Sequence, residues 1–177
     1  MKHRARTLLF WLLVSLIGGA SRAQRDREPL HAAEIDQLRD AAMDPEQRLR
    51  LFVQFARARL ISLNEVQADP KAKDRTQQEH DLLQDFLDIY DELNDNIDNF
   101  VQRREDMRKP LRVVIEGDSK CLSKLHAAKI SSDIARPEDK LPEFLLTTAI
   151  STVVSSAQDH RQLLEHQEET AKARKKH

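Results

Sequence analysis

The segment DLLQDFLDIYDELNDNIDNFV, residues 81–101, carries seven acidic side chains and neither lysine nor arginine, yet it is rich in large apolar residues. The apolar residues recur on one side of a helical wheel. They are Leu83, Phe86, Tyr90, Leu93, Ile97 and Phe100, flanked by Leu82 and Ile89 and continued by Met107. A stripe this broad predicts a long helix with one buried face.

The acidic residues of this segment fall on the opposite side of the wheel. Carboxylates three or four residues apart form seven pairs, and each like-charge pair destabilises a helix by about 0.2–0.5 kcal/mol. Burial of one large apolar side chain contributes about 1.5–3 kcal/mol, so packing outweighs the repulsion. The sequence therefore predicts a helix that depends on its neighbours for stability.

We name five of these residues, Asp81, Asp85, Asp88, Glu92 and Asp95, the acidic stripe. Three interpretations remain open for it: a solvated face, ion pairs with the arginine-rich segment before it, or a surface that docks a basic partner or weakly gathers divalent cations. That segment supplies Arg48, Arg50, Arg57 and Arg59. A calcium loop of the EF-hand type is not expected, because the segment lacks the central glycine and the closing glutamate.

Capping residues and prolines divide the rest of the chain into helices. Asp44 with Pro45 and Gln47 begins one helix, and Thr76 with Glu79 resembles a capping box that begins the acidic helix. The expected helices follow a short segment at 30–43 and cover about 45–66, 76–108 and 110–130, with a break or kink at Gly117. The last helix starts at about 142, passes through residues 143–157 and ends in a polar, charged tail. We predict an all-α, single-domain bundle of four or five mostly antiparallel helices. The alternative is an elongated coiled-coil hairpin that oligomerises.

The amino terminus has the three parts of a secretory signal: basic residues, an apolar run over residues 8–17, and small residues before Ala23. The apolar run is too short to span a bilayer, which favours a cleaved signal over a retained anchor. The predicted organisation is a signal peptide at 1–23, a helical domain at 24–172 and a basic polar tail at 173–177. Export to the periplasm or the extracellular space follows.

Composition excludes several kinds of function. Residues 1–23 contain four of the 29 basic side chains and none of the 30 acidic ones, so 25 basic and 30 acidic residues remain after cleavage. This acidic balance argues against nucleic-acid binding, and only the basic tail could touch an anionic membrane. Gly117 would be the one remaining glycine, which excludes glycine-rich phosphate loops.

A second pattern occupies the last helix, where hydroxyl residues recur in steps of four. We name Thr148, Ser151, Thr152 and Ser155 the hydroxyl stripe. Small residues at this spacing let another helix backbone approach closely, and this is the favoured interpretation. The alternative is a ligand cavity lined by hydroxyl groups.

Neither histidine nor cysteine spacing matches a known metal or catalytic motif. No two histidines stand four residues apart, and Cys121 is the only cysteine. We expect Cys121 to be a buried apolar residue and to form no dyad with His126, which points elsewhere on a helix. No metal, no cofactor and no enzymatic activity are therefore predicted.

The expected function is that of an exported, non-enzymatic helical protein, which binds a protein partner, acts as a scaffold or associates with itself. The second expectation is a helical bundle that binds a small ligand or a metal outside the cytoplasm, motivated by the hydroxyl stripe and the scattered histidines. An enzyme with a site assembled from distant residues is the third.

Overall fold

The computed structural model describes residues 28–69, 71–137 and 140–174, and this part of the chain contains five helices and no strand. The helices are α2 (Ala32–Asp40), α3 (Pro45–Ala68), α4 (Arg75–Gln102), α5 (Arg108–Ile134) and α6 (Glu143–Arg174). They pack against one another as one bundle, which confirms the predicted all-α class. The predicted signal peptide lies outside the described residues, and none of the described helices is long and apolar enough to cross a membrane.

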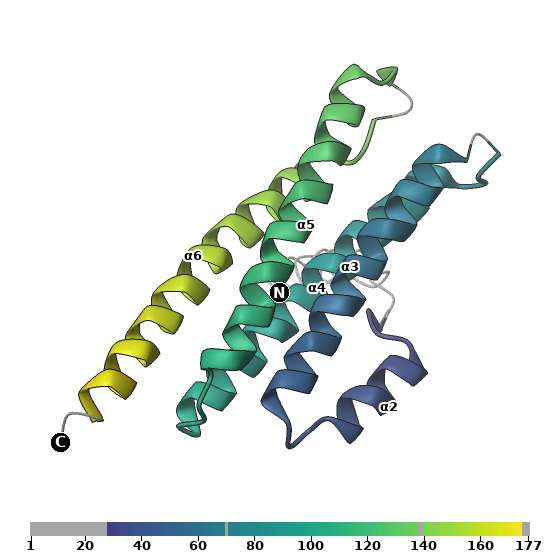
Figure 1. The fold of residues 1–177 in the computed structure, drawn as a ribbon. Helices are drawn as coiled ribbons and strands as arrows, with labels where there is room; N and C mark the ends of the chain where they lie inside the picture. Colours follow the sequence, from purple (N-terminus) through teal and green to yellow (C-terminus); the bar gives the residue numbers. More distant parts are fainter. Residues whose placement is uncertain (1–27, 70, 138–139, 175–177) are drawn as a thin grey trace, which may run out of the picture.

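The four long helices run alternately up and down (Figure 1). α3 lies beside both α4 and α5, and α6 lies beside α5 and, over a smaller contact, α4. The short helix α2 packs mainly against α3, and its buried residue is Leu38. α4 and α5 therefore face each other diagonally across the bundle.

The apolar face predicted for the acidic helix is buried as expected. Leu83, Phe86 and Leu93 are fully enclosed, and Tyr90, Ile97 and Phe100 are nearly so. Met107 is also fully buried, but it precedes the first turn of α5 instead of continuing α4. The heptad-like pattern thus identified core residues correctly, even beyond the end of its helix.

The predicted helix boundaries hold at the start of α3 and differ most at the two ends of α4, and α6 continues to Arg174, into the predicted basic tail at 173–177. Asp44 caps α3 as predicted, with its carboxylate accepting a hydrogen bond from Gln47 N at 3.0 Å. The capping box at Thr76 and Glu79 was wrong, because α4 begins at Arg75 and Glu79 is buried. α4 also ends at Gln102, six residues earlier than expected, and so leaves room for a tight connection to α5.

Polar contacts set the register between α3 and α4. Arg48 Nε donates to Asn96 Oδ1 at 2.6 Å, and Arg59 Nε lies 3.8 Å from Asp85 Oδ2. From the first contact to the second, the chain moves about three turns forward in α3 and about three turns back in α4. The two helices are therefore antiparallel. The expected pairing of α3 arginines with α4 carboxylates is confirmed for Arg59 and Asp85.

Gly117 does not break α5, which continues as one helix from Arg108 to Ile134. The predicted kink was wrong, because this glycine allows close packing instead of a bend. A Cβ atom at position 117 would lie 2.5 Å from Cγ1 and 3.0 Å from Cγ2 of Val53 in α3. Since a β-branched side chain has few alternative rotamers, Val53 cannot simply turn away.

Gly117→Ala is expected to lower the free energy of unfolding by about 1–2 kcal/mol. The overpacking against Val53 costs about 1–3 kcal/mol, and the better helix propensity of alanine returns up to about 1 kcal/mol. Urea denaturation measures the difference. Combining Gly117→Ala with Val53→Ala removes the clash, so the double variant should lose less than the sum of the two single losses. Additive losses would contradict the close contact.

Candidate functional site

The acidic stripe is exposed in part only. Glu92 and Asp95 are exposed, and Asp81 and Asp88 are half-buried. Asp85 is buried at 6% exposure, which corrects its expected place on the outward face. The reason is that Arg59 of α3 draws this carboxylate into the α3–α4 contact. Docking of a basic partner on the remaining four residues stays a prediction.

Replacing Asp91, which lies beside the acidic stripe, should stabilise the protein. Partial burial, then the charges of Asp88 and Asp95, raise the pKa of Asp91 above its ordinary value of 3.8. Because the folded state holds this proton more tightly, the ionised carboxylate destabilises the fold at neutral pH. Asp91→Asn is expected to raise the free energy of unfolding by about 0.4–1 kcal/mol. Urea denaturation of the parent and the variant at a series of pH values measures this gain, which should vanish below pH 3.8. A gain in the free energy of unfolding that stays constant with pH would contradict this account.

The hydroxyl stripe lies on the outer side of α6. Ser151 and Ser155 are exposed, and Thr148 and Thr152 are half-buried. Thr148 Oγ1 donates to the carbonyl of Phe144, and Ser151 Oγ donates to the carbonyl of Thr148. These two hydroxyl groups are thus occupied by their own helix, and close packing against another helix backbone stays a prediction.

The face of α6 that carries the hydroxyl stripe has no charge over four turns. Residues 144–158 contain no acidic or basic side chain, although 33% of the whole chain is charged. Phe144 is 80% exposed and Val154 is 50% exposed. We name this outward side of residues 144–158 the uncharged face.

A polar network that the sequence did not reveal lies in the core. Tyr90 of α4 donates its hydroxyl to Asp118 Oδ1 of α5 at 2.5 Å, and His160 Nδ1 of α6 lies 3.0 Å from Asp118 Oδ2. His160 Nε2 lies 3.1 Å from Asn94 Oδ1, and the Asn94 amide donates to Ser156 Oγ at 3.0 Å. We name these five residues the core network. It joins three helices, including the diagonal pair.

The core network has the geometry of a structural site. Asp118 is fully buried and His160 is 4% exposed, so substrate cannot reach either one without opening the bundle. Both ring nitrogens of His160 face Asp118 and Asn94, and the Ser156 hydroxyl is bonded to Asn94 instead of the imidazole. Nucleophilic catalysis needs the hydroxyl and the base to be hydrogen-bonded.

Cys121 lies one turn from Asp118 and is buried, as predicted. Burial first, and then the nearby Asp118, raises the pKa of the thiol to about 12. The thiol therefore stays protonated near neutral pH and is a poor nucleophile. His126 is exposed, whereas Cys121 is buried, so they lie on different sides of α5 as expected.

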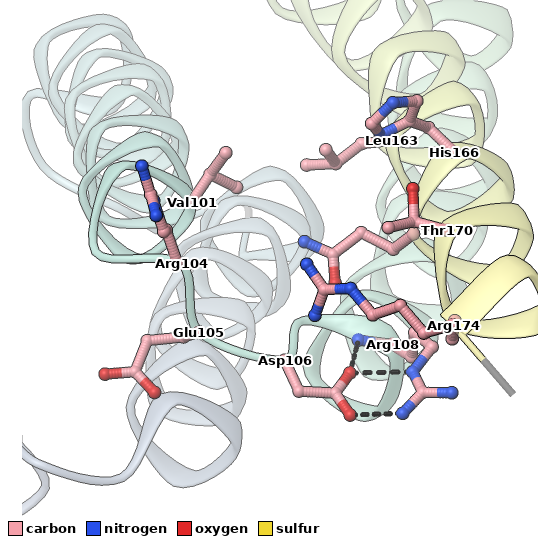
Figure 2. Close-up of a pocket in the computed structure, with 11 residues that line it drawn as sticks. Val101, Arg104, Glu105, Asp106, Arg108, Leu163, His166, Thr170 and Arg174 are labelled. Carbon is pink, nitrogen blue, oxygen red and sulfur yellow. Dashed lines mark hydrogen bonds and ion pairs between the residues drawn. The ribbon is translucent and has the colours of Figure 1, made fainter. Parts of the chain in front are cut away.

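An open pocket lies at the end of the bundle where α4 connects to α5. It is bordered by this connection and by the carboxyl-terminal half of α6 (Figure 2). Its volume is about 610 Å³. The lining residues are Val101, Arg104, Glu105, Asp106, Arg108, Leu163, His166, Gln167, Thr170, Ala171 and Arg174. We name it the arginine pocket.

The acidic groups of the arginine pocket already have cationic partners. Arg108 Nε donates to Asp106 Oδ1 at 2.8 Å, and Glu105 is bonded by Arg103 at 3.2 Å. The hydrogen bond from Arg108 lowers the pKa of Asp106 to about 2, so this carboxylate remains charged. The guanidinium groups of Arg104 and Arg174 form no hydrogen bond or ion pair with any residue in the described ranges. The pocket therefore retains uncompensated positive charge.

The backbone places Arg104 in a conformation that favours glycine. Its φ angle is 61°, in the left-handed region. Glu105 N donates to the carbonyl of Phe100, and Arg104 N donates to the carbonyl of Val101. This pair of bonds is a Schellman motif, in which glycine is the preferred residue at the position of Arg104.

Arg104→Gly is therefore expected to raise the free energy of unfolding by about 1 kcal/mol, because glycine adopts positive φ without the steric cost of a Cβ atom. Thermal denaturation followed by circular dichroism measures the change. Arg103→Gly is the matched control, since Arg103 has a φ of −76°. This control should be no more stable than the parent, and a gain as large as that of Arg104→Gly would contradict the assignment of strain.

The arginine pocket was missed from the sequence because its walls come from residues about 60 positions apart. The only local signal is the run of charges at residues 103–109. Among the described residues, no group of three or more histidine, cysteine or acidic side chains is placed to hold a metal ion. Comparisons with protein-family models, curated proteins and solved structures find no match for this chain.

Proposed function

We propose that this chain is an exported, non-enzymatic helical protein that works by protein–protein association, with the uncharged face of α6 as its contact surface. The observation that carries the proposal is the run without charge at residues 144–158, with Phe144 and Val154 exposed on it. The expected export signal at residues 1–23 supports a role outside the cytoplasm.

Self-association is the form of contact that this surface suits best. At 1.5 Å per residue the uncharged face is roughly 22 Å long. Two copies can approach there without like-charge repulsion, and Ser151 and Ser155 leave room for a second helix backbone. The hydroxyl groups of Thr148 and Ser151 need no partner across the contact, because backbone carbonyls already accept their hydrogen bonds.

The test is the mass of the exported protein in solution, measured by gel filtration with light scattering. We expect a dimer or larger assembly that Val154→Glu dissociates, because a buried like-charge pair opposes association. Ile61→Glu adds the same charge at an exposed site of α3 and should leave the assembly intact. A monomer at every concentration that also retrieves no protein from the extracytoplasmic fraction would refute the proposal.

Export is testable separately by mass spectrometry of the protein recovered outside the cytoplasm. Cleavage after Ala23 predicts a mature chain that begins at Gln24. A chain that retains residues 1–23 would support a membrane-anchored form instead.

The alternative function, a bundle that binds a small ligand or a metal, is not favoured by the features that first suggested it. Two hydroxyl groups of the hydroxyl stripe bond to their own helix, and the described residues bring no metal-ligating cluster together.

A further inference from the structure

The proposed association through α6 makes no use of the arginine pocket. In Figure 2, Arg104 and Glu105 lie on one side of the pocket, near the end of α4, and Arg174 and Thr170 project from α6 on the other side. Asp106 and Arg108 form an ion pair between them. Two guanidinium groups thus border one cavity from two different elements.

Positive charge without a partner among the described residues determines which ligands the pocket can accept. Asp106 and Glu105 are committed to Arg108 and Arg103, so they do not neutralise Arg104 or Arg174. A guanidinium group binds carboxylate or phosphate through two parallel hydrogen bonds. Because the two guanidinium groups are positively charged, the pocket disfavours cations.

The remaining walls of the pocket are apolar or carry neutral polar groups. Val101, Leu163 and Ala171 contribute apolar surface, and Thr170 contributes a hydroxyl group. The volume of about 610 Å³ lies within the usual range for small-molecule sites, about 300–1,000 Å³. The space therefore suits a molecule with an apolar part as well as an anionic group.

The strained backbone at Arg104 also supports a binding role for this side chain. Glycine would suit its left-handed conformation better, yet the chain has an arginine there whose side chain contacts no acidic group of the described residues. Strain of this kind accumulates where a side chain is needed for binding.

We propose that the arginine pocket binds a small organic anion, a phosphate or carboxylate group on an apolar body, present either as a free molecule or as the headgroup of an anionic lipid. Arg104 and Arg174 hold the anionic group from opposite sides. Val101 and Leu163 contact the apolar part.

Titration calorimetry of the exported protein at constant ionic strength tests this proposal with phenyl phosphate and benzoate as probes. Benzyl alcohol, which has no charge, is the matched probe and should not bind. Arg104→Gly and Arg174→Ala should each weaken binding of the charged probes by roughly ten-fold, as expected for the loss of one charge-assisted contact. Arg104→Gly should do so while raising the melting temperature, which rules out misfolding as the cause.

Two controls separate local binding from general electrostatics. Lys109→Ala removes a neighbouring positive charge that does not line the pocket and should change the affinity by less than about two-fold. Val154→Glu should leave the affinity unchanged, so failure of the association proposal and failure of the pocket proposal give different results.

Co-sedimentation with phosphatidylcholine vesicles, with and without phosphatidylglycerol, distinguishes the source of the anion. Binding of phenyl phosphate or benzoate without vesicle binding identifies a free organic anion. Vesicle binding that requires phosphatidylglycerol and is lost in Arg104→Gly identifies a lipid headgroup. If neither the probes nor the vesicles bind, or if Arg104→Gly and Arg174→Ala bind as the parent does, the proposal is wrong.

Discussion

Asp118→Ala is expected to lower the free energy of unfolding by about 3–5 kcal/mol, the loss typical of removing one member of a buried, paired set. The Asp118 carboxylate is fully buried and accepts from the Tyr90 hydroxyl at 2.5 Å while lying 3.0 Å from His160 Nδ1. Burial first, and then the charge of Asp118, raises the pKa of Tyr90 well above its ordinary value, so the phenol remains a donor. Without the carboxylate, a buried phenol and imidazole both lose their acceptor.

Urea denaturation followed by circular dichroism measures this loss. Asp133→Ala is the matched control in the same helix, because Asp133 forms only an exposed pair with Lys129 and should cost no more than about 0.5 kcal/mol. A triple variant with Tyr90→Phe, Asp118→Leu and His160→Leu removes every polar member except the Asn94–Ser156 pair, and it should recover much of the stability. Equal effects of Asp118→Ala and Asp133→Ala would show that the core network does not stabilise the fold.

Arg59→Ala is expected to cost a similar amount, about 3–5 kcal/mol. Arg59 is 5% exposed and donates to Glu34 through two nitrogens, at 2.9 and 2.5 Å, and to the carbonyl of Pro29 at 2.7 Å. These bonds attach α2 and Pro29, three residues before the helix begins, to the bundle, and the helix itself buries little besides Leu38. Hydrogen exchange of α2 amides should therefore become much faster in this variant, in addition to the loss seen in urea.

Arg50→Ala is the control for Arg59→Ala, since Arg50 forms an exposed pair with Glu46 in the same helix and should cost about 0.5 kcal/mol or less. The pH dependence adds a second check. Burial opposes ionisation of Glu34, but hydrogen bonds from Arg59 and from the His31 backbone, together with the positive charges, lower its pKa below 4.5. The parent protein should thus lose stability as the pH falls below 4.5, and Arg59→Ala should lose less over that range. Retention of the full acid-dependent loss would contradict the role of Arg59.

The amphipathic helices were predictable because their signals are local. A helix repeats every 3.6 residues, so the apolar residues of α4 identify a buried face without knowledge of what covers it. Asp44 was predictable for the same reason, because a capping side chain bonds to its own backbone three residues later. The Thr76 boundary failed since Glu79 is buried against the bundle, and a capping pattern alone carries no information about burial.

Gly117 shows how one residue can support opposite local interpretations. A glycine within a helical segment predicts a break, since it favours the unfolded chain. The structure keeps the helix intact because Val53 of α3 occupies the space that a side chain would need. Only the position of a residue 64 places earlier distinguishes the two outcomes.

The sequence by itself determined the helical class, the buried faces of the long helices and the lack of glycine-rich or metal-binding motifs, because each of these depends on composition or on spacing within one segment. The tertiary structure decided the core network, the burial of Asp85, the close contact at Gly117 and the arginine pocket. Each of these joins side chains from different helices, and the pairing of helices depends on packing across the whole bundle, which no local repeat encodes.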